Sequence, residues 1–273
     1  SWPPASATTT STDSSTTFLD PLTLETREAT LTRRRSVVGV DSLVRGADAV
    51  LVSTTIVDPA GSVVIRQRWS AVQDRFTGTA IDSPANIEKV TSFNGSGDAV
   101  EGERRLVDVQ GVVVRFPRNT QPVTYRRWDP ETSRTGMARF VRRDRLAGKD
   151  VLVFQQAESA PAAGSEAGTY SETTMWVRPE VGGVVKTDTH LTVRTSGGVT
   201  ILDANFVDSA NSVMHASTDV DRVVARARLT GDVIPILVLV LGVVTGIAAA
   251  LEGGAGWFTR RLCRGRDRSQ ANN

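Results

Sequence analysis

Residues 50–72 read VLVSTTIVDPAGSVVIRQRWSAV, and this stretch determines the expected fold class. Its first half alternates between two faces, one of which carries Val50, Val52, Thr54 and Ile56. Such period-two alternation is typical of a β-strand. The turn Asp58-Pro59-Ala60-Gly61 has Pro second and Gly fourth, as a type I turn prefers, and the chain then returns with a similar alternation. The stretch therefore predicts an antiparallel hairpin.

Comparable strand patterns occur further along the chain, separated by turns and polar connections. They cover residues 106–116, 123–128, 138–146, 151–156, 173–177, 184–194 and 199–206. Only residues 217–232 show a helical period, behind Ser217 or Thr218 as the N-cap. We therefore expect a mainly β domain over residues 29–216, an antiparallel sandwich or a strongly curved sheet, followed by a short juxtamembrane helix.

Residues 1–28 begin with SWPPASATTTSTDSSTT, a low-complexity stretch rich in Ser and Thr. It has little apolar surface to offset the entropy that ordering would cost. We therefore expect a flexible tether. Because the sequence begins with Ser1 and shows no export signal, we also expect a further segment upstream.

Residues 233–251, VIPILVLVLGVVTGIAAAL, contain no charged side chain. At about 1.5 Å per residue, a helix of this length spans a hydrocarbon core of about 30 Å. We therefore expect one membrane-spanning anchor rather than a buried helix of a soluble protein. Gly242, Gly246 and Ala250 form a stripe of small residues, which predicts a helix-packing seam. Its expected partner is an upstream helix of the same chain or a helix of a multi-spanning transporter.

The tail, residues 252–273, contains five Arg residues and two acidic residues. The positive-inside rule places this tail in the cytoplasm and the main domain outside the plasma membrane. The tail carries a formal charge of +3, so the chain's net +2 leaves −1 for residues 1–251. No nucleic-acid partner is therefore expected. The single cysteine, Cys263, also lies in the tail, so we expect no disulfide in the outer domain.

Candidate catalytic groups are few. Two histidines, His190 and His215, and one cysteine cannot form a recognisable zinc site. His190 lies on the polar face of its strand and is expected to be solvated, although Asp188 is close enough in sequence to orient it. Neither a phosphate-binding glycine loop nor a nucleophile elbow occurs. We therefore expect no enzyme activity, no metal and no cofactor.

Five short motifs stand out along the domain. They are DRFTG at residues 74–78, GVVVRFP at 111–117, YRRWDP at 125–130, GKDVLVF at 148–154 and WVRP at 176–179. In this order and spacing they resemble the actinobacterial PorA family of cell-envelope proteins, over about residues 45–250. Two features depart from the family: its usual N-terminal membrane helix is not seen, and its often acidic position is Arg178.

The resemblance implies an envelope protein of mycolic-acid bacteria or their relatives. Some family members look like accessory factors for mycolate glycolipids that work beside a lipid exporter. The expected function is therefore a membrane-anchored, extracytoplasmic module that binds an acylated glycolipid or another lipid. The residues expected to line its apolar site are Phe116, Tyr125, Trp128 and Trp176. The same aromatic side chains would equally suit a β-sheet core.

Two other functions compete with lipid binding. A structural or scaffolding protein without a ligand would have a solid core, whereas a lipid-binding domain would enclose an apolar cavity on the order of several hundred Å³. A literal porin is disfavoured, because residues 138–146 include Arg139, Arg142, Arg143 and Arg145 and could not face lipid.

Overall fold

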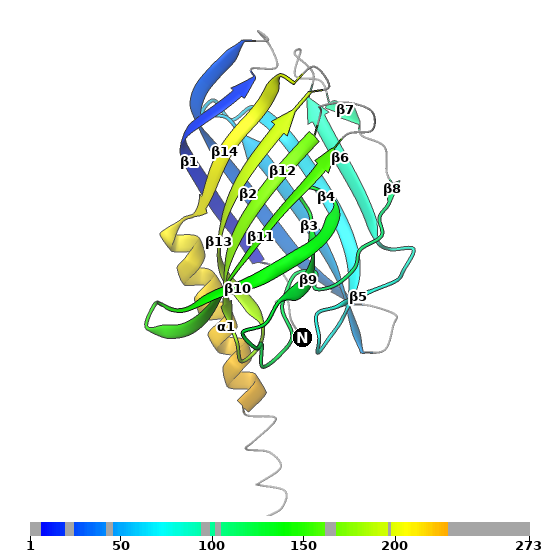
Figure 1. Cartoon of the computed structure of the whole chain (residues 1–273), viewed down its shortest axis with the longest axis vertical. Helices are drawn as coiled ribbons and strands as arrows, with labels where there is room; N and C mark the ends of the chain where they lie inside the picture. Colours follow the sequence, from blue (N-terminus) through cyan, green and yellow to red (C-terminus); the bar gives the residue numbers. More distant parts are fainter. Residues whose placement is uncertain are drawn as a thin grey trace, which may run out of the picture. The chain divides into compact units, whose positions relative to one another are not determined.

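The computed structural model describes residues 7–19, 25–41, 46–93, 99–101, 105–161, 168–195 and 198–228. These residues contain fourteen β-strands and one α-helix (Figure 1). The first eight strands are β1 (Ala7–Leu19), β2 (Thr26–Asp41), β3 (Ala47–Val57), β4 (Val63–Asp74), β5 (Ala80–Ile81), β6 (Ile87–Phe93), β7 (Ala99–Glu101) and β8 (Arg105–Leu106). The others are β9 (Tyr125–Asp129), β10 (Arg134–Leu146), β11 (Lys149–Pro161), β12 (Gly168–Arg178), β13 (Gly183–Arg194) and β14 (Thr200–Asp208), followed by α1 (Ala210–Arg228). The chain is mainly β, as predicted, and divides into two compact units, residues 1–223 and 224–273.

The strands form one antiparallel sheet in the order β7-β6-β4-β3-β2-β1-β14-β13-β12-β11-β10-β9, with β5 paired to β4 and β8 to β6. Most neighbours in the sheet are also neighbours in the sequence. The exception at the centre is β1, which pairs with β14 and places Ser11 opposite Asp208. The predicted hairpin within residues 50–72 is confirmed as β3 and β4, and Val50, Val52, Thr54 and Ile56 are its buried face.

The sheet curves strongly, so that strands distant in its order pack against each other. Ile56 of β3 and Val64 of β4 share an apolar cluster with Leu191 of β13, although β1, β2 and β14 lie between these strands in the sheet. Elsewhere Gln67 of β4 donates a hydrogen bond to the carbonyl of Pro130, which follows β9. Of the two forms expected, the structure has the curved sheet rather than two separate sheets.

The predicted strand over residues 106–116 is wrong, because only Arg105–Leu106 belongs to a strand. The segment that follows forms only isolated bridges at Val112, to Thr79 and to Arg127 of β9, and otherwise bonds to turns. The Phe116 amide, for example, donates to the carbonyl of Gly182 at 2.8 Å. The close approach requires glycine at that position, because a Cβ built on Gly182 would lie 1.9 Å from the Phe116 oxygen.

The predicted tether over residues 1–28 is wrong for its described part. Residues 7–19 form β1, which pairs with β2 on one side and β14 on the other. Threonine suits a pleated strand, and the neighbouring strands supply the backbone hydrogen bonds. Ser11 and Thr16 are buried, so β1 points polar side chains inward. Its sequence therefore lacks the alternating apolar residues by which a strand is usually predicted.

The helix begins at Ala210 rather than at residue 217. Ser209 is its N-cap, because the Ser212 amide donates to the Ser209 hydroxyl at 3.2 Å. No helix among the described residues is long and apolar enough to cross a membrane. Residues 229–273 lie outside the described part, and with them the predicted anchor at 233–251, the basic tail and the stripe of Gly242, Gly246 and Ala250.

Candidate functional site

A partly open cavity of about 130 Å³ is lined by strands from both halves of the curved sheet and by α1. Its apolar lining comes from β2, β3, β4, the segment before β9, and β13, and comprises Val37, Val52, Trp69, Val113, Val114, Val184 and Val185. Charged and hydroxyl side chains complete it: Thr9, Arg35, Arg127, Lys186, Thr187, Asp208 and Asp219. The volume is below the several hundred Å³ expected of a site that encloses a whole lipid. The cavity therefore has room for part of one.

A more open groove of about 450 Å³ lies over β10, β11 and β12. Its lining includes Met137 and Tyr170, but also Arg139, Glu158 and Glu172. This groove is too polar to favour an acyl chain, so the smaller internal cavity is the stronger candidate site.

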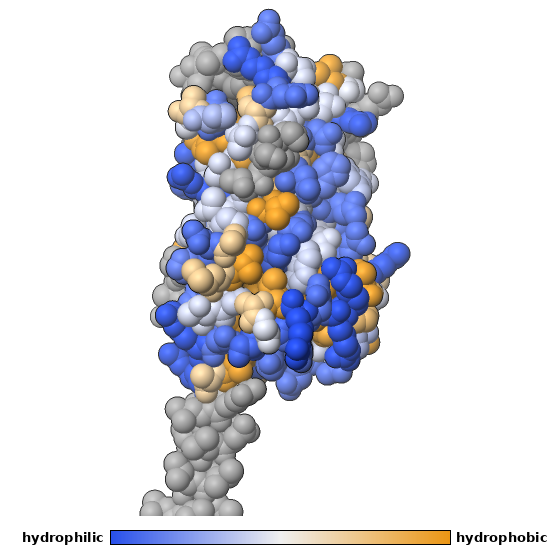
Figure 2. Space-filling model, turned by 90° about the vertical axis from the view of Figure 1, so that its left-hand side faces the viewer, coloured by the Kyte–Doolittle hydropathy of each residue, from blue (hydrophilic) through white to orange (hydrophobic). Residues whose placement is uncertain are grey.

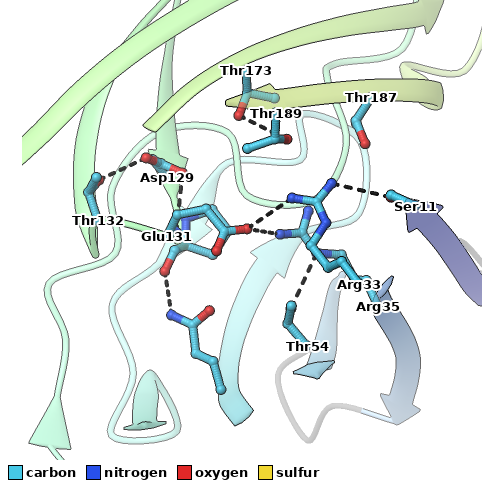
Figure 3. A network of polar contacts seen from close by, with 12 residues as sticks. Ser11, Arg33, Arg35, Thr54, Asp129, Glu131, Thr132, Thr173, Thr187 and Thr189 are labelled. Carbon is cyan, nitrogen blue, oxygen red and sulfur yellow. Dashed lines mark hydrogen bonds and ion pairs between the residues drawn. The ribbon is translucent and has the colours of Figure 1, made fainter. Parts of the chain in front are cut away.

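A network of buried polar side chains lies beside the cavity (Figure 3). Glu131, which follows β9, forms ion pairs with two arginines of β2, Arg33 at 3.7 Å and Arg35. Arg33 is only 2 % exposed. Its Nη2 lies 3.4 Å from the Ser11 hydroxyl, and its guanidinium lies 4.9 Å from the centre of the Phe206 ring.

Two residues of β9 extend this network. Arg127 donates through Nη1 to Gln156 Oε1 at 2.9 Å, and Gln156 Nε2 donates back to the Arg127 carbonyl at 3.0 Å. Asp129 accepts hydrogen bonds from the Thr132 hydroxyl at 2.8 Å and from the Glu131 amide at 3.2 Å. The interior thus holds a charged, hydrogen-bonded layer between apolar clusters.

The buried position of these groups shifts their pKa values. Burial lowers the pKa of Arg33 to about 10, with Arg35 acting in the same direction and Glu131 opposing. Burial also lowers the pKa of Arg127 to about 10. Both guanidinium groups therefore stay charged at neutral pH. Burial, and then the charge of Glu131, raise the pKa of Asp129 above its ordinary 3.8.

The family model described as Porin PorA matches residues 3–251. The chain belongs to the PorA porin family. This confirms the resemblance inferred from the five motifs and supports a place in the membrane or the cell envelope. No curated protein matches the chain.

In this PorA family member, the four aromatic residues predicted to bind lipid do not line the cavity. Phe116 and Tyr125 do meet, with their rings edge to face at 5.4 Å between centroids. Trp128 belongs to a different cluster, and Trp176 donates its Nε1 hydrogen to Asp144 at 3.2 Å. All four pack within the domain, so their contact with a lipid stays a prediction.

The sequence patterns did not predict the two arginines of β2 in the network, of which Arg33 is buried and Arg35 is partly exposed. The sequence does contain a signal for them, because Leu31, Arg33, Arg35 and Val37 are spaced two residues apart along the strand. Successive side chains of a strand point to opposite faces, so these four residues are expected on one face. Arg127 offers no such signal, since its neighbour Trp128 is buried too.

His190 is partly exposed and hydrogen-bonds to Asp203 at 2.7 Å. The nearby Asp188 instead accepts from Lys186 at 3.1 Å. Asp203 therefore orients His190, rather than Asp188, which is closer in the sequence.

The raised pKa of Asp129 leads to a pH-dependent prediction. The folded state binds the proton more tightly than the unfolded state, so the contribution of Asp129 to stability is present below about pH 3.8 and is lost as the pH rises through its folded pKa. Asp129→Asn keeps a neutral side chain of the same shape, and the Thr132 hydroxyl can rotate to accept from its amide. We expect the thermal midpoint of the variant, relative to the unsubstituted protein, to increase from pH 4 to pH 8. A difference that stays constant with pH would contradict this, and the exposed Asp150→Asn serves as the control.

Proposed function

We propose that this PorA family member is a membrane-anchored envelope protein whose extracytoplasmic β domain binds a lipid or acylated glycolipid. The observation that carries the proposal is the internal cavity, where valines and Trp69 would contact an acyl chain. Arg35, Arg127 and Lys186 lie among the polar residues of the same cavity and would hold the polar head. Family membership supports the envelope location. We propose no catalytic role.

The membrane topology of the proposal comes from the sequence. Residues 233–251 would form the anchor, with the basic tail in the cytoplasm and the β domain outside. The stripe of Gly242, Gly246 and Ala250 would pack against a second helix, either upstream in the same chain or in a multi-spanning lipid transporter.

The exposed surface does not favour lipid contact from outside. On the face shown in Figure 2, apolar residues are scattered among hydrophilic ones. On β10, Arg139, Arg142, Arg143 and Arg145 are exposed, and these charges would be costly in hydrocarbon. Both observations favour an internal site over the channel that the family's description names. A scaffold without a ligand is the remaining alternative.

Filling the cavity tests the proposal. Ala216 of α1 lines the cavity, and Ala216→Trp would place an indole in the space meant for the acyl chain. We expect the full chain, extracted from its host and examined by native mass spectrometry, to carry lipid, and this variant to lose most of it. Ala225→Trp is the matched control, because Ala225 is exposed on the same helix.

The outcomes separate the two functions. A folded, unsubstituted chain that carries no lipid would favour the scaffold. Lipid retained equally by both tryptophan variants would show that the ligand lies elsewhere on the protein.

A further inference from the structure

Several buried N–H groups near the cavity have no hydrogen-bond acceptor among the described residues. They are Trp69 Nε1, Trp128 Nε1, Arg127 Nε and Arg33 Nε. Trp69 is 4 % exposed and Arg127 is 7 % exposed, and both line the cavity. Leaving a buried N–H group without an acceptor costs about 1–3 kcal/mol. These donors therefore lack acceptors that would stabilise the region.

Two buried acceptor oxygens, Asp48 Oδ2 and Asp188 Oδ1, also lack a hydrogen-bond partner, but neither residue lines the cavity. The acceptors beside the cavity already receive bonds. The Glu131 carboxylate is shared by Arg33 and Arg35, and Gln156 Oε1 accepts from Arg127. The two acidic residues in the cavity wall are also occupied. Asp208 accepts from Ser11 and Thr187, and Asp219 accepts from Arg222.

The chemistry of the missing group follows from this imbalance. A carboxylate or phosphate accepts hydrogen bonds without bringing donors of its own, whereas a hydroxyl brings a further donor that would need an acceptor. Bonds from N–H groups to an anion are also stronger than bonds to a neutral oxygen. The site therefore suits an acceptor-only oxyanion better than a hydroxylated neutral head.

The size of the cavity limits the apolar part of the ligand. At about 130 Å³ it is close to the ~150 Å³ apolar cavity that holds one benzene molecule. One slim alkyl chain fits a space of this size beside the valines, and two chains side by side do not.

From these observations we propose that the cavity takes a single-chain amphiphile with an oxyanion head, a carboxylate or a phosphate, bound by Trp69 and Arg127. This inference rests on the proposed function and specifies its ligand class. The oxyanion would accept the unpaired N–H groups, and the first carbons of the chain would contact Val52 and Val113.

The test compares three probes that share a ten-carbon chain and differ in the head group. Decanoate, decyl phosphate and decanol are titrated calorimetrically into the full chain in lipid nanodiscs, with empty nanodiscs subtracted. We expect at least one anion to bind about tenfold or more tightly than decanol, and the tighter anion identifies the head. Equal affinity for all three would overturn the oxyanion head and leave acyl binding intact. If none of the three binds, both this inference and the proposed function fail.

A conservative variant then tests the donor itself. Trp69→Phe keeps an aromatic ring but removes the unpaired N–H, so the anion should bind about tenfold more weakly while decanol affinity stays unchanged. Tyr170→Phe is the control, because Tyr170 lies outside the cavity and the hydroxyl that it loses already bonds to Glu172. Unchanged anion affinity in a folded Trp69→Phe protein would overturn the role of this group.

Discussion

Gly182→Ala is expected to destabilise the domain by more than about 3 kcal/mol, which is among the largest effects of a single small substitution. Gly182 has φ +68°, where an added Cβ is strained, and that Cβ would lie 1.9 Å from the Phe116 oxygen and 2.7 Å from the Pro117 oxygen. Both contacts are with backbone, which cannot rotate away. Either the turn between β12 and β13 or the segment at Phe116 must move, and the hydrogen bond between them is lost.

Gly148→Ala is the matched control for this prediction. Gly148 has a similar φ of +74°, but a Cβ there would meet no atom within 4 Å. We expect it to cost only the backbone strain, about 1–2 kcal/mol. Urea titrations of the two variants measure the difference, which isolates the steric contact from the strain. Equal urea midpoints for the two variants would mean that the segment at Phe116 moves easily to accommodate the added methyl group, contrary to the packing described above.

Glu131→Gln is the second substitution with a large expected effect. Glu131 is the carboxylate that Arg33 and Arg35 share, and its side chain is 7 % exposed. Neutralising it leaves two guanidinium groups without their charge partner in the interior. Breaking a buried pair in this way costs about 3–5 kcal/mol, because the remaining charge stays desolvated. The measurement is the urea midpoint at neutral pH.

The surface pair between Arg145 and Asp150 supplies the control. Its atoms are 3.0 Å apart, but the side chains are 77 % and 81 % exposed. Asp150→Asn should therefore leave the urea midpoint nearly unchanged. A small effect of Glu131→Gln, similar to this one, would show that water reaches Arg33 and Arg35 in solution and replaces the carboxylate.

The parts of the fold that could be predicted are those encoded by neighbouring residues. The β3–β4 hairpin follows from alternation and from the turn Asp58–Gly61, whose Asp58 carbonyl accepts from the Gly61 amide at 3.0 Å. The turns between β10 and β11 and between β12 and β13 were found in the same way, because glycine marks them. The order of strands in the sheet was not predictable, since it depends on pairings between distant segments.

The parts that were missed depend on contacts far away in the sequence. β1 is a strand because β2 and β14 flank it, and its own Ser/Thr composition gives no apolar pattern. Arg33 is buried because Glu131, almost a hundred residues later, supplies its charge partner. The four aromatic residues predicted to bind lipid pack within the domain outside this cavity, which Trp69 and several valines line, so their contact with a lipid stays a prediction.

The pairing of β1 with β14 also constrains the order in which the domain can fold. Ser11 bonds to Asp208, so the central seam of the sheet joins segments separated by 197 residues. β1 cannot gain its second neighbour until almost the entire domain has emerged from the ribosome. Contacts of such long range slow folding, and the free edge of β1 stays open to other chains meanwhile. The protein should therefore depend on holding chaperones until β14 is available, and at high concentration β1 of one copy should pair with β14 of another to form strand-exchanged dimers.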